Sequence, residues 1–235
     1  MTSGDGIWHP VGLSAAIEPG TANGTRLLGS EIVVWRDTDG LVHVWEDRCP
    51  HRGMRLSLGF VRGDQIACLY HGWRYDAGGR CRFIPAHPQL APPETIRVPA
   101  LHAAERLGMI WARSGDAGEE PSPDRPVTAV RSIAVECAPE EAVSHLGGSD
   151  LGRSPSPLQA SAAIPAHPPG LAFATAGLHA LAIGVQPLSA TECILHVVLA
   201  EHGDDDATAR KRASAWAEMV RSALERPRRG MAAGP

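Results

Sequence analysis

The chain lacks the features that would direct it to a membrane, to nucleic acid or to the cell exterior. It has no apolar run of about 18 residues, which argues against a transmembrane helix. Its 22 basic and 26 acidic residues give a formal charge of −4, so no charge excess favours nucleic acid or a membrane surface. Residues 1–8 contain neither a basic nor a long apolar stretch and predict no secretory signal. We therefore expect a cytoplasmic protein.

Cysteine is scarce, with five in 235 residues. Two of them lie in the motif described next, and the other three form an odd set: Cys81, Cys137 and Cys193. An odd number argues against a disulfide framework and fits a reducing compartment. Cys81 lies on a predicted strand, and we interpret it as a packing residue.

What the chain does contain is a pair of loops rich in metal-ligating residue types. Residues 49–53 have the sequence Cys-Pro-His-Arg-Gly, and residues 68–73 have the sequence Cys-Leu-Tyr-His-Gly-Trp. Each segment offers one thiolate and one imidazole and is too short and too Gly-punctuated to be a helix. The glycines allow the backbone to turn tightly and to approach a metal centre. Two such loops facing each other supply two sulfur and two nitrogen ligands.

This paired motif resembles the cluster-binding loops of Rieske domains, in particular those of Rieske non-haem iron oxygenases. The resemblance implies a [2Fe–2S] cluster with the cysteines on one iron and the histidines on the other. Its ligands would be Cys49, His51, Cys68 and His71. Respiratory Rieske proteins carry an extra cysteine in each loop, and this chain does not. Structural zinc is an alternative, but zinc motifs usually keep cysteines together and histidines together. Four buried residues without a metal are a second alternative, disfavoured by the spacing and by both glycines.

The residues around the loops predict short antiparallel strands. Residues 31–36 are β-branched and aromatic, residues 41–45 alternate in the manner of a half-buried strand, and the two segments flank an Asp-Gly turn. Residues 108–113 are predicted to be a closing strand. The order of motifs over residues 7–113 resembles the N-terminal domain of the vanillate O-demethylase and phthalate dioxygenase group. We therefore predict a mainly β Rieske domain over residues 1–113, with the two cluster-binding loops at the tips of adjacent hairpins.

A polar segment rich in proline and glycine, residues 114–126, is predicted to be a linker. Residues 127–235 then predict a strand, a short helix at 139–145, several strands over 158–199 and a long last helix. The predicted apolar face of that last helix consists of Ala209, Ala213, Trp216, Val220, Ala223 and Leu224. This order resembles a small α+β helix-grip domain, a shortened form of the oxygenase catalytic domain.

The second domain departs from the family pattern where a mononuclear Fe(II) would bind. Rieske oxygenases hold that iron with two histidines and a carboxylate, and their local pattern is Asn-x-x-Asp-x-x-His-x4-His. The four corresponding positions here are Pro139, Ala142, His145 and Asp150. A rearranged triad built on His145 and Asp150 would need a third ligand, for which the candidates are Glu141, His167 and His179. The pattern as it stands argues against a mononuclear iron and leaves His145 and Asp150 as the candidate catalytic residues.

Two functions follow from the resemblance. The first is a one-electron carrier or auxiliary subunit that takes electrons from a reductase or ferredoxin and passes them to an iron-bearing oxygenase subunit. The second is a complete miniature oxygenase, acting as a hydroxylase or an O- or N-demethylase. A redox sensor is a third possibility, which no DNA-binding helix supports. The missing iron ligands favour the first function, and either of the first two makes the protein an oxidoreductase component that can form homo- or hetero-oligomers.

Overall fold

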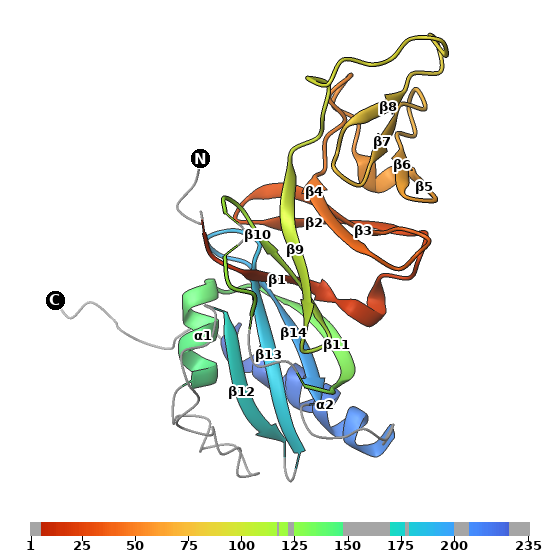
Figure 1. The fold of residues 1–235 in the computed structure, drawn as a ribbon. Coiled ribbons are helices and arrows are strands. Elements are labelled where there is room, and N and C mark those ends of the chain that lie inside the picture. The colour runs from red at the N-terminus through yellow and green to blue at the C-terminus, as the bar shows by residue number, and fades with distance from the viewer. Residues whose placement is uncertain are drawn as a thin grey trace, which may run out of the picture.

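The computed structural model describes residues 6–116, 118–121, 125–147, 170–176, 179–199 and 207–225. These residues form three antiparallel sheets and two α-helices, with a small sheet at one end of the molecule and the long helix at the other (Figure 1). In this part of the chain, no helix is long and apolar enough to cross a membrane.

The first sheet has six strands in the order β1-β10-β9-β4-β3-β2. Its strands are β1 (His9–Leu13), β2 (Ala22–Leu27), β3 (Ser30–Arg36), β4 (Val42–Glu46), β9 (Ala100–Arg106) and β10 (Met109–Arg113), with a short 3-10 helix η1 (Ser14–Ala16) after β1. The predicted hairpin and the predicted closing strand are confirmed, because β3 pairs with β4 and β10 pairs with β9 and β1. Gly40 makes the hairpin turn possible, since its φ of +91° suits glycine.

The second sheet is small and lies at the far end of the molecule (Figure 1). It follows the 3-10 helix η2 (Leu56–Leu58) and contains β5 (Phe60–Arg62), β6 (Gln65–Ala67), β7 (Arg74–Asp76) and β8 (Cys81–Phe83) in that order. Ile66 and Tyr75 are completely buried in its core, and Cys81 is buried beside them. The interpretation of Cys81 as a packing residue is therefore confirmed.

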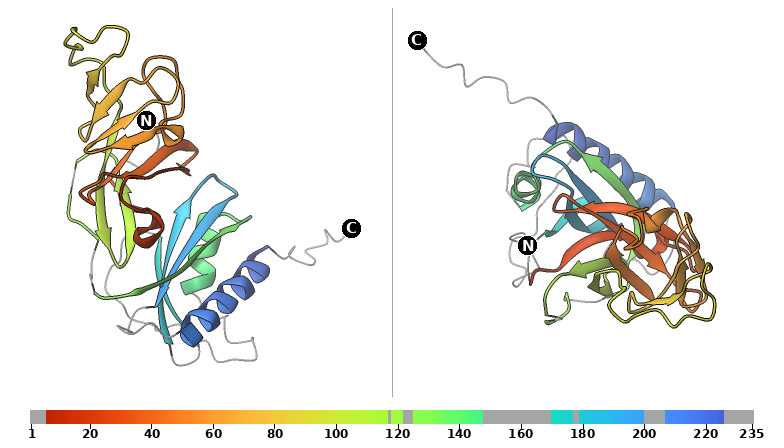
Figure 2. Two further views of the ribbon diagram at one scale, coloured as in Figure 1. Left: turned by 90° about the vertical axis from the view of Figure 1, so that its right-hand side faces the viewer. Right: turned by 90° about the horizontal axis from the view of Figure 1, so that it is seen from above.

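The third sheet has the order β11-β14-β13-β12, and α2 lies along one of its faces (Figure 2). Its elements are β11 (Thr128–Val135), α1 (Pro139–Gly147), β12 (Leu171–Ala176), β13 (His179–Pro187), β14 (Cys193–Leu199) and α2 (Ala207–Leu224). Most of the predicted apolar face of α2 is buried, but Ala223 is exposed and that part of the prediction was wrong. Ala217 takes its place, because it follows Ala213 by about one turn and faces the sheet.

The other face of the third sheet packs against the first sheet. Trp111 and Leu13 of the first sheet share one apolar cluster with Val198 and Ala182 of the third. The sheets approach closely at Gly184, since a Cβ there would lie 2.7 Å from the Met109 sulfur and 2.9 Å from the Cβ of Pro10. The strand β14 is consequently buried on both faces.

A chain of hydrogen bonds, buried at its centre, crosses between these two sheets. Gln186 is fully buried, and its side-chain amide donates to the Thr25 hydroxyl at 2.9 Å and to the Arg26 carbonyl at 2.7 Å. Its side-chain oxygen lies 2.8 Å from Nε2 of His196, whose Nδ1 lies 2.8 Å from the Ser132 hydroxyl. Because an amide oxygen only accepts, Nε2 carries the proton and Nδ1 accepts from Ser132. Burial lowers the pKa of His196 from 6.5 to about 4, so the ring is neutral at pH 7.

Candidate metal centre

The first loop is a tight turn closed by two backbone hydrogen bonds. The Cys49 N–H donates to the Met54 carbonyl at 2.8 Å, and the Gly53 N–H donates to the Cys49 carbonyl at 2.8 Å. Gly53 has a φ of +74°, a conformation in which other residues are strained. This turn leaves His51 half-buried at its tip, while the Cys49 side chain points into the core, where it is 2 % exposed.

The second loop repeats the same turn. The Cys68 N–H donates to the Trp73 carbonyl at 2.9 Å, the Gly72 N–H donates to the Cys68 carbonyl at 3.0 Å, and Gly72 has a φ of +67°. The pattern is the same in both loops. The cysteine N–H donates to the carbonyl of the fifth residue after it, and the N–H of the glycine four residues after the cysteine donates to the cysteine carbonyl. Only the position of the histidine differs, at the second residue after Cys49 and the third after Cys68.

The two loops differ in how the sheets hold them. The second loop joins the paired strands β6 and β7 and is a hairpin tip, as predicted. The first loop leaves β4 of the first sheet and runs through η2 to β5 of the second sheet, so the expectation of a hairpin there was wrong. Asp47 fixes its base instead, because that buried carboxylate accepts from the Ser57 N–H at 2.7 Å and from the Ser57 hydroxyl at 2.5 Å.

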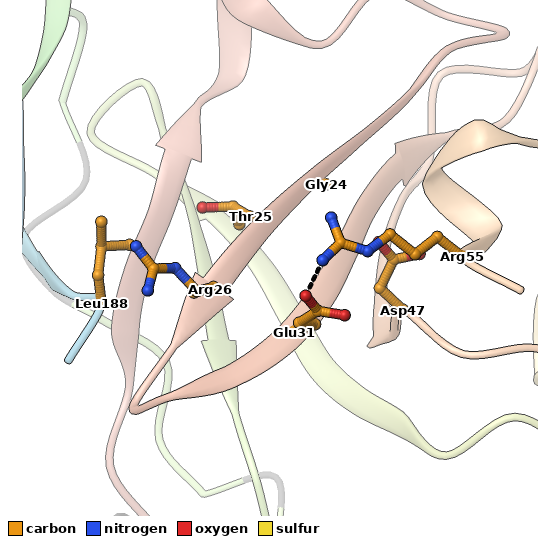
Figure 3. Close-up of a pocket in the computed structure, with 7 residues that line it drawn as sticks. All are labelled: Gly24, Thr25, Arg26, Glu31, Asp47, Arg55 and Leu188. Carbon is orange, nitrogen blue, oxygen red and sulfur yellow. Dashed lines mark hydrogen bonds and ion pairs between the residues drawn. The ribbon is translucent and has the colours of Figure 1, made fainter. Parts of the chain in front are cut away.

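Asp47 belongs to a hollow of about 430 Å³ between the β2–β3 hairpin and the first loop (Figure 3). Three of the charged side chains around it are ion-paired: Arg55 pairs with Glu31, and Arg26 lies 2.9 Å from Glu192. Gly24 lines the hollow because a Cβ at this position would lie 2.8 Å from the Ser57 hydroxyl oxygen. Both oxygens of Asp47 accept from Ser57, so we interpret the hollow as a support for the first loop.

The sulfur side of the centre is buried. Cys68 is 3 % exposed, and burial, with the neighbouring Cys49, raises the pKa of its thiol. The Tyr75 hydroxyl lies 3.0 Å from the Cys49 sulfur, and burial together with that contact raises the pKa of Tyr75. Tyr75 thus stays protonated and can donate to a Cys49 thiolate. The available sequence signal for Tyr75 was its two-residue spacing from Trp73, which lies just before β7 and packs against the same core.

The nitrogen side of the centre faces solvent. The rings of His51 and His71 lie 4.8 Å apart between centroids, with His71 exposed and His51 half-buried. The Trp73 ring stacks on His51 at 4.3 Å, and the Tyr70 ring lies 3.8 Å from His71. Desolvation, with the nearby His71 and Arg52, lowers the pKa of His51, which favours the neutral imidazole that binds metal.

This donor set fits a binuclear [2Fe–2S] centre. The two thiols adjoin each other on the buried side and the two imidazoles adjoin each other at the surface, so each iron would receive two protein ligands of one kind. Among the described residues, no three ligand-type side chains gather round a single metal position. A mononuclear site with three or four protein ligands, such as structural zinc, therefore fits the arrangement less well.

The candidate catalytic residues of the second part are only partly described. His145 and Glu141 lie on α1, and His179 begins β13. Asp150 and His167 lie outside the described residues. Ala142, at the position of the family aspartate, is completely buried in the core under α1.

Comparisons with known proteins agree with this centre. Residues 7–98 match the family model for the Rieske [2Fe–2S] domain. The oxidoreductase NdmD of Pseudomonas putida is 42 % identical over 115 residues, which is 48 % of this chain and 20 % of NdmD. The fold resembles a solved structure of P. putida NdmA (QL mutant with theobromine), with a TM-score of 0.75 and 21 % identity over 97 % of this chain and 84 % of that one. It also resembles dicamba monooxygenase bound to 3,6-dichlorosalicylic acid, with a TM-score of 0.76 and 19 % identity over 96 % and 88 % of the two chains. The chain spans a third or less of the length of the curated relatives it matches.

Proposed function

We propose that this chain, a Rieske [2Fe–2S] domain protein related to the Rieske oxygenases, carries single electrons within a non-haem iron oxygenase system. The [2Fe–2S] cluster that a Rieske domain implies supplies the chemistry, taking up and releasing one electron at a time. Rieske oxygenase systems take electrons from a reductase. In this proposal the donor is a reductase or ferredoxin and the acceptor is an iron-bearing oxygenase subunit in the cytoplasm.

The proposed ligands are Cys49 and Cys68 for the inner iron and His51 and His71 for the outer iron. The burial of both sulfurs and the surface position of both rings support this division. Buried sulfurs are protected from solvent, whereas exposed imidazole edges can be reached by a partner. The neutral imidazoles also leave the centre less negative than four thiolates would, which raises its reduction potential.

Tyr75 is expected to tune that potential. Its hydroxyl, 3.0 Å from the Cys49 sulfur, stabilises the more negative reduced state. The substitution Tyr75→Phe should lower the reduction potential by on the order of 50 mV, which corresponds to about 1 kcal/mol for one electron. Protein-film voltammetry measures the shift, and Cys81→Ala, a buried change in the same core, is the control that should leave the potential nearly constant. Equal potentials for wild type and Tyr75→Phe would contradict the assigned role.

The choice of carrier over oxygenase is supported chiefly by Ala142. This residue takes the position of the family aspartate, and as a completely buried alanine in an apolar core it offers no carboxylate at that position. In this proposal residues 127–235 form a shortened helix-grip domain, joined by the linker 114–126 to the Rieske domain 1–113. The helix-grip domain serves as a docking or oligomerisation surface and holds no mononuclear iron.

Iron and acid-labile sulfide analysis of the purified full chain tests the choice. A carrier contains two irons for two sulfides, whereas a complete oxygenase contains three irons for two sulfides. We expect the lower ratio, and we expect His145→Ala to leave it unchanged. A third iron that disappears in His145→Ala, together with product formation from the reductase-supplied chain alone, would favour the miniature oxygenase.

A further inference from the structure

A small basic pocket of about 260 Å³ lies beside the first cluster loop. Three of its lining residues are arginines, Arg48, Arg52 and Arg97, and its only acidic lining residue is Glu46. His51 forms part of the same wall. The pocket therefore brings an excess of positive charge next to one of the proposed iron ligands.

That positive charge is not compensated by the rest of the described chain. Arg48 and Arg52 are exposed and make no ion pair with a described residue, and Arg97 donates only a long hydrogen bond of 3.4 Å to the Gly78 carbonyl. Other arginines near the loops are paired: Arg55 with Glu31, Arg80 with Glu94, and Arg82 with Asp76. The pocket is therefore positively charged although the whole chain has a net charge of −4.

An exposed apolar and aromatic patch adjoins the pocket. The His51 ring touches His71, and His71 touches Tyr70, so the pocket continues into the tip of the second loop. Leu69 and Tyr70 at that tip are 49 % and 56 % exposed. An aromatic and apolar centre beside arginines is the composition typical of protein–protein interfaces, and a site for a small anion would not need it.

We propose that this surface, made of Arg48, Arg52, Arg97, Leu69 and Tyr70, is the docking site for an acidic protein electron donor. This inference rests on the proposed function of the chain. Carboxylates of the donor enter the arginine pocket, and an apolar patch of the donor covers the tip of the second loop. One electron then leaves the reduced iron–sulfur centre of the donor, which is oxidised, and reduces the [2Fe–2S] cluster of this chain without transfer of a proton. The step is downhill for a plant-type ferredoxin, whose potential lies below that of Rieske centres.

Stopped-flow reduction of the oxidised full chain by an acidic plant-type ferredoxin tests this surface. The wild-type second-order rate constant should fall as ionic strength rises from about 0.02 to about 0.5 M, because opposite charges steer the encounter. The variant Arg48→Glu/Arg52→Glu should be slower by about tenfold or more at low salt and should lose that salt dependence. The matched control, Lys211→Glu/Arg212→Glu, makes the same change in net charge on exposed residues of α2, at the opposite end of the molecule (Figure 1), and should react within about twofold of wild type.

Two further measurements keep the result decisive. The visible spectrum and reduction by dithionite report on the cluster itself. A wild-type chain without a reducible cluster would contradict the proposed function as well as the docking site. Binding of a redox-inactive, gallium-substituted ferredoxin, followed by biolayer interferometry, should weaken in parallel with the rate. If Arg48→Glu/Arg52→Glu loses the cluster, Arg97→Glu, which lies outside both loops, is expected to show the same kinetic defect.

Three results would overturn the docking surface. The first is equal ferredoxin kinetics for wild type and the pocket variants. The second is a wild-type chain that dithionite reduces and ferredoxin does not. The third is binding of inorganic phosphate that the pocket variants lose while ferredoxin kinetics stay unchanged, which would make the pocket a small-anion site.

Discussion

Replacing either Cys49 or Cys68 with serine should abolish the cluster and loosen the whole tip of the molecule. Both side chains are almost completely buried in one apolar core, so an unligated serine hydroxyl there is left without water. Ligation is also part of the folding free energy of a small metal-binding domain. The purified variants should lack the visible absorption of the cluster, contain no stoichiometric iron, and be cut by protease within the loops 49–54 and 68–73.

Cys81→Ser is the matched control for these two variants. Cys81 is buried in the same core and is not a proposed ligand, so its variant should lose some stability and keep its full iron and sulfide content. Retention of a cluster by Cys49→Ser or Cys68→Ser would contradict the ligand assignment. Stoichiometric zinc in the wild-type protein, with no colour, would contradict the nature of the centre.

The local part of the metal centre could be predicted from sequence because its determinants are local. Each loop encodes its turn with a cysteine and a glycine four residues later, and the same two hydrogen bonds result in both. The path of the first loop between two different sheets could not be predicted in this way. It depends on the pairing of β4 with β9, whose residues are far apart in the sequence, and on the contact between Asp47 and Ser57.

The second part of the chain shows the limit of periodicity as a signal. The order of strands and helices agreed with the prediction over the described residues. The apolar face of α2 was predicted less well, because Ala217 lies in the core and Ala223, which was predicted to lie there, is exposed. Along β14, Leu195, Val197 and Leu199 alternate with His196 and Val198, a pattern that by itself gives no reason to bury His196. That residue is buried because the second face of the sheet packs against the first sheet, which only the tertiary structure determines.

Because His196 is buried as a neutral base, acid should destabilise the fold through this one residue. Its pKa is about 4 in the folded chain against 6.5 for an ordinary histidine, so below pH 6.5 the unfolded chain binds a proton that the folded chain excludes. The free energy of unfolding therefore falls as the pH falls, by about 1.4 kcal/mol per pH unit. The loss begins near pH 6.5, reaches about 3 kcal/mol near pH 4, and then levels off as the folded chain also binds the proton.

Urea unfolding followed by circular dichroism, at several pH values between 7.5 and 4, measures this loss when wild type is compared with His196→Gln. Glutamine can still bond both Ser132 and Gln186 but does not titrate, so the variant should be the less stable protein at pH 7 and should lose less stability on acidification. The comparison is needed because burial also lowers the pKa of His9, and the contribution of His9 is common to both proteins. The difference in unfolding free energy between the two proteins should shrink by about 3 kcal/mol between pH 7 and pH 4. A difference that stays constant over this range would mean that His196 is already protonated, or reaches solvent, in the folded chain.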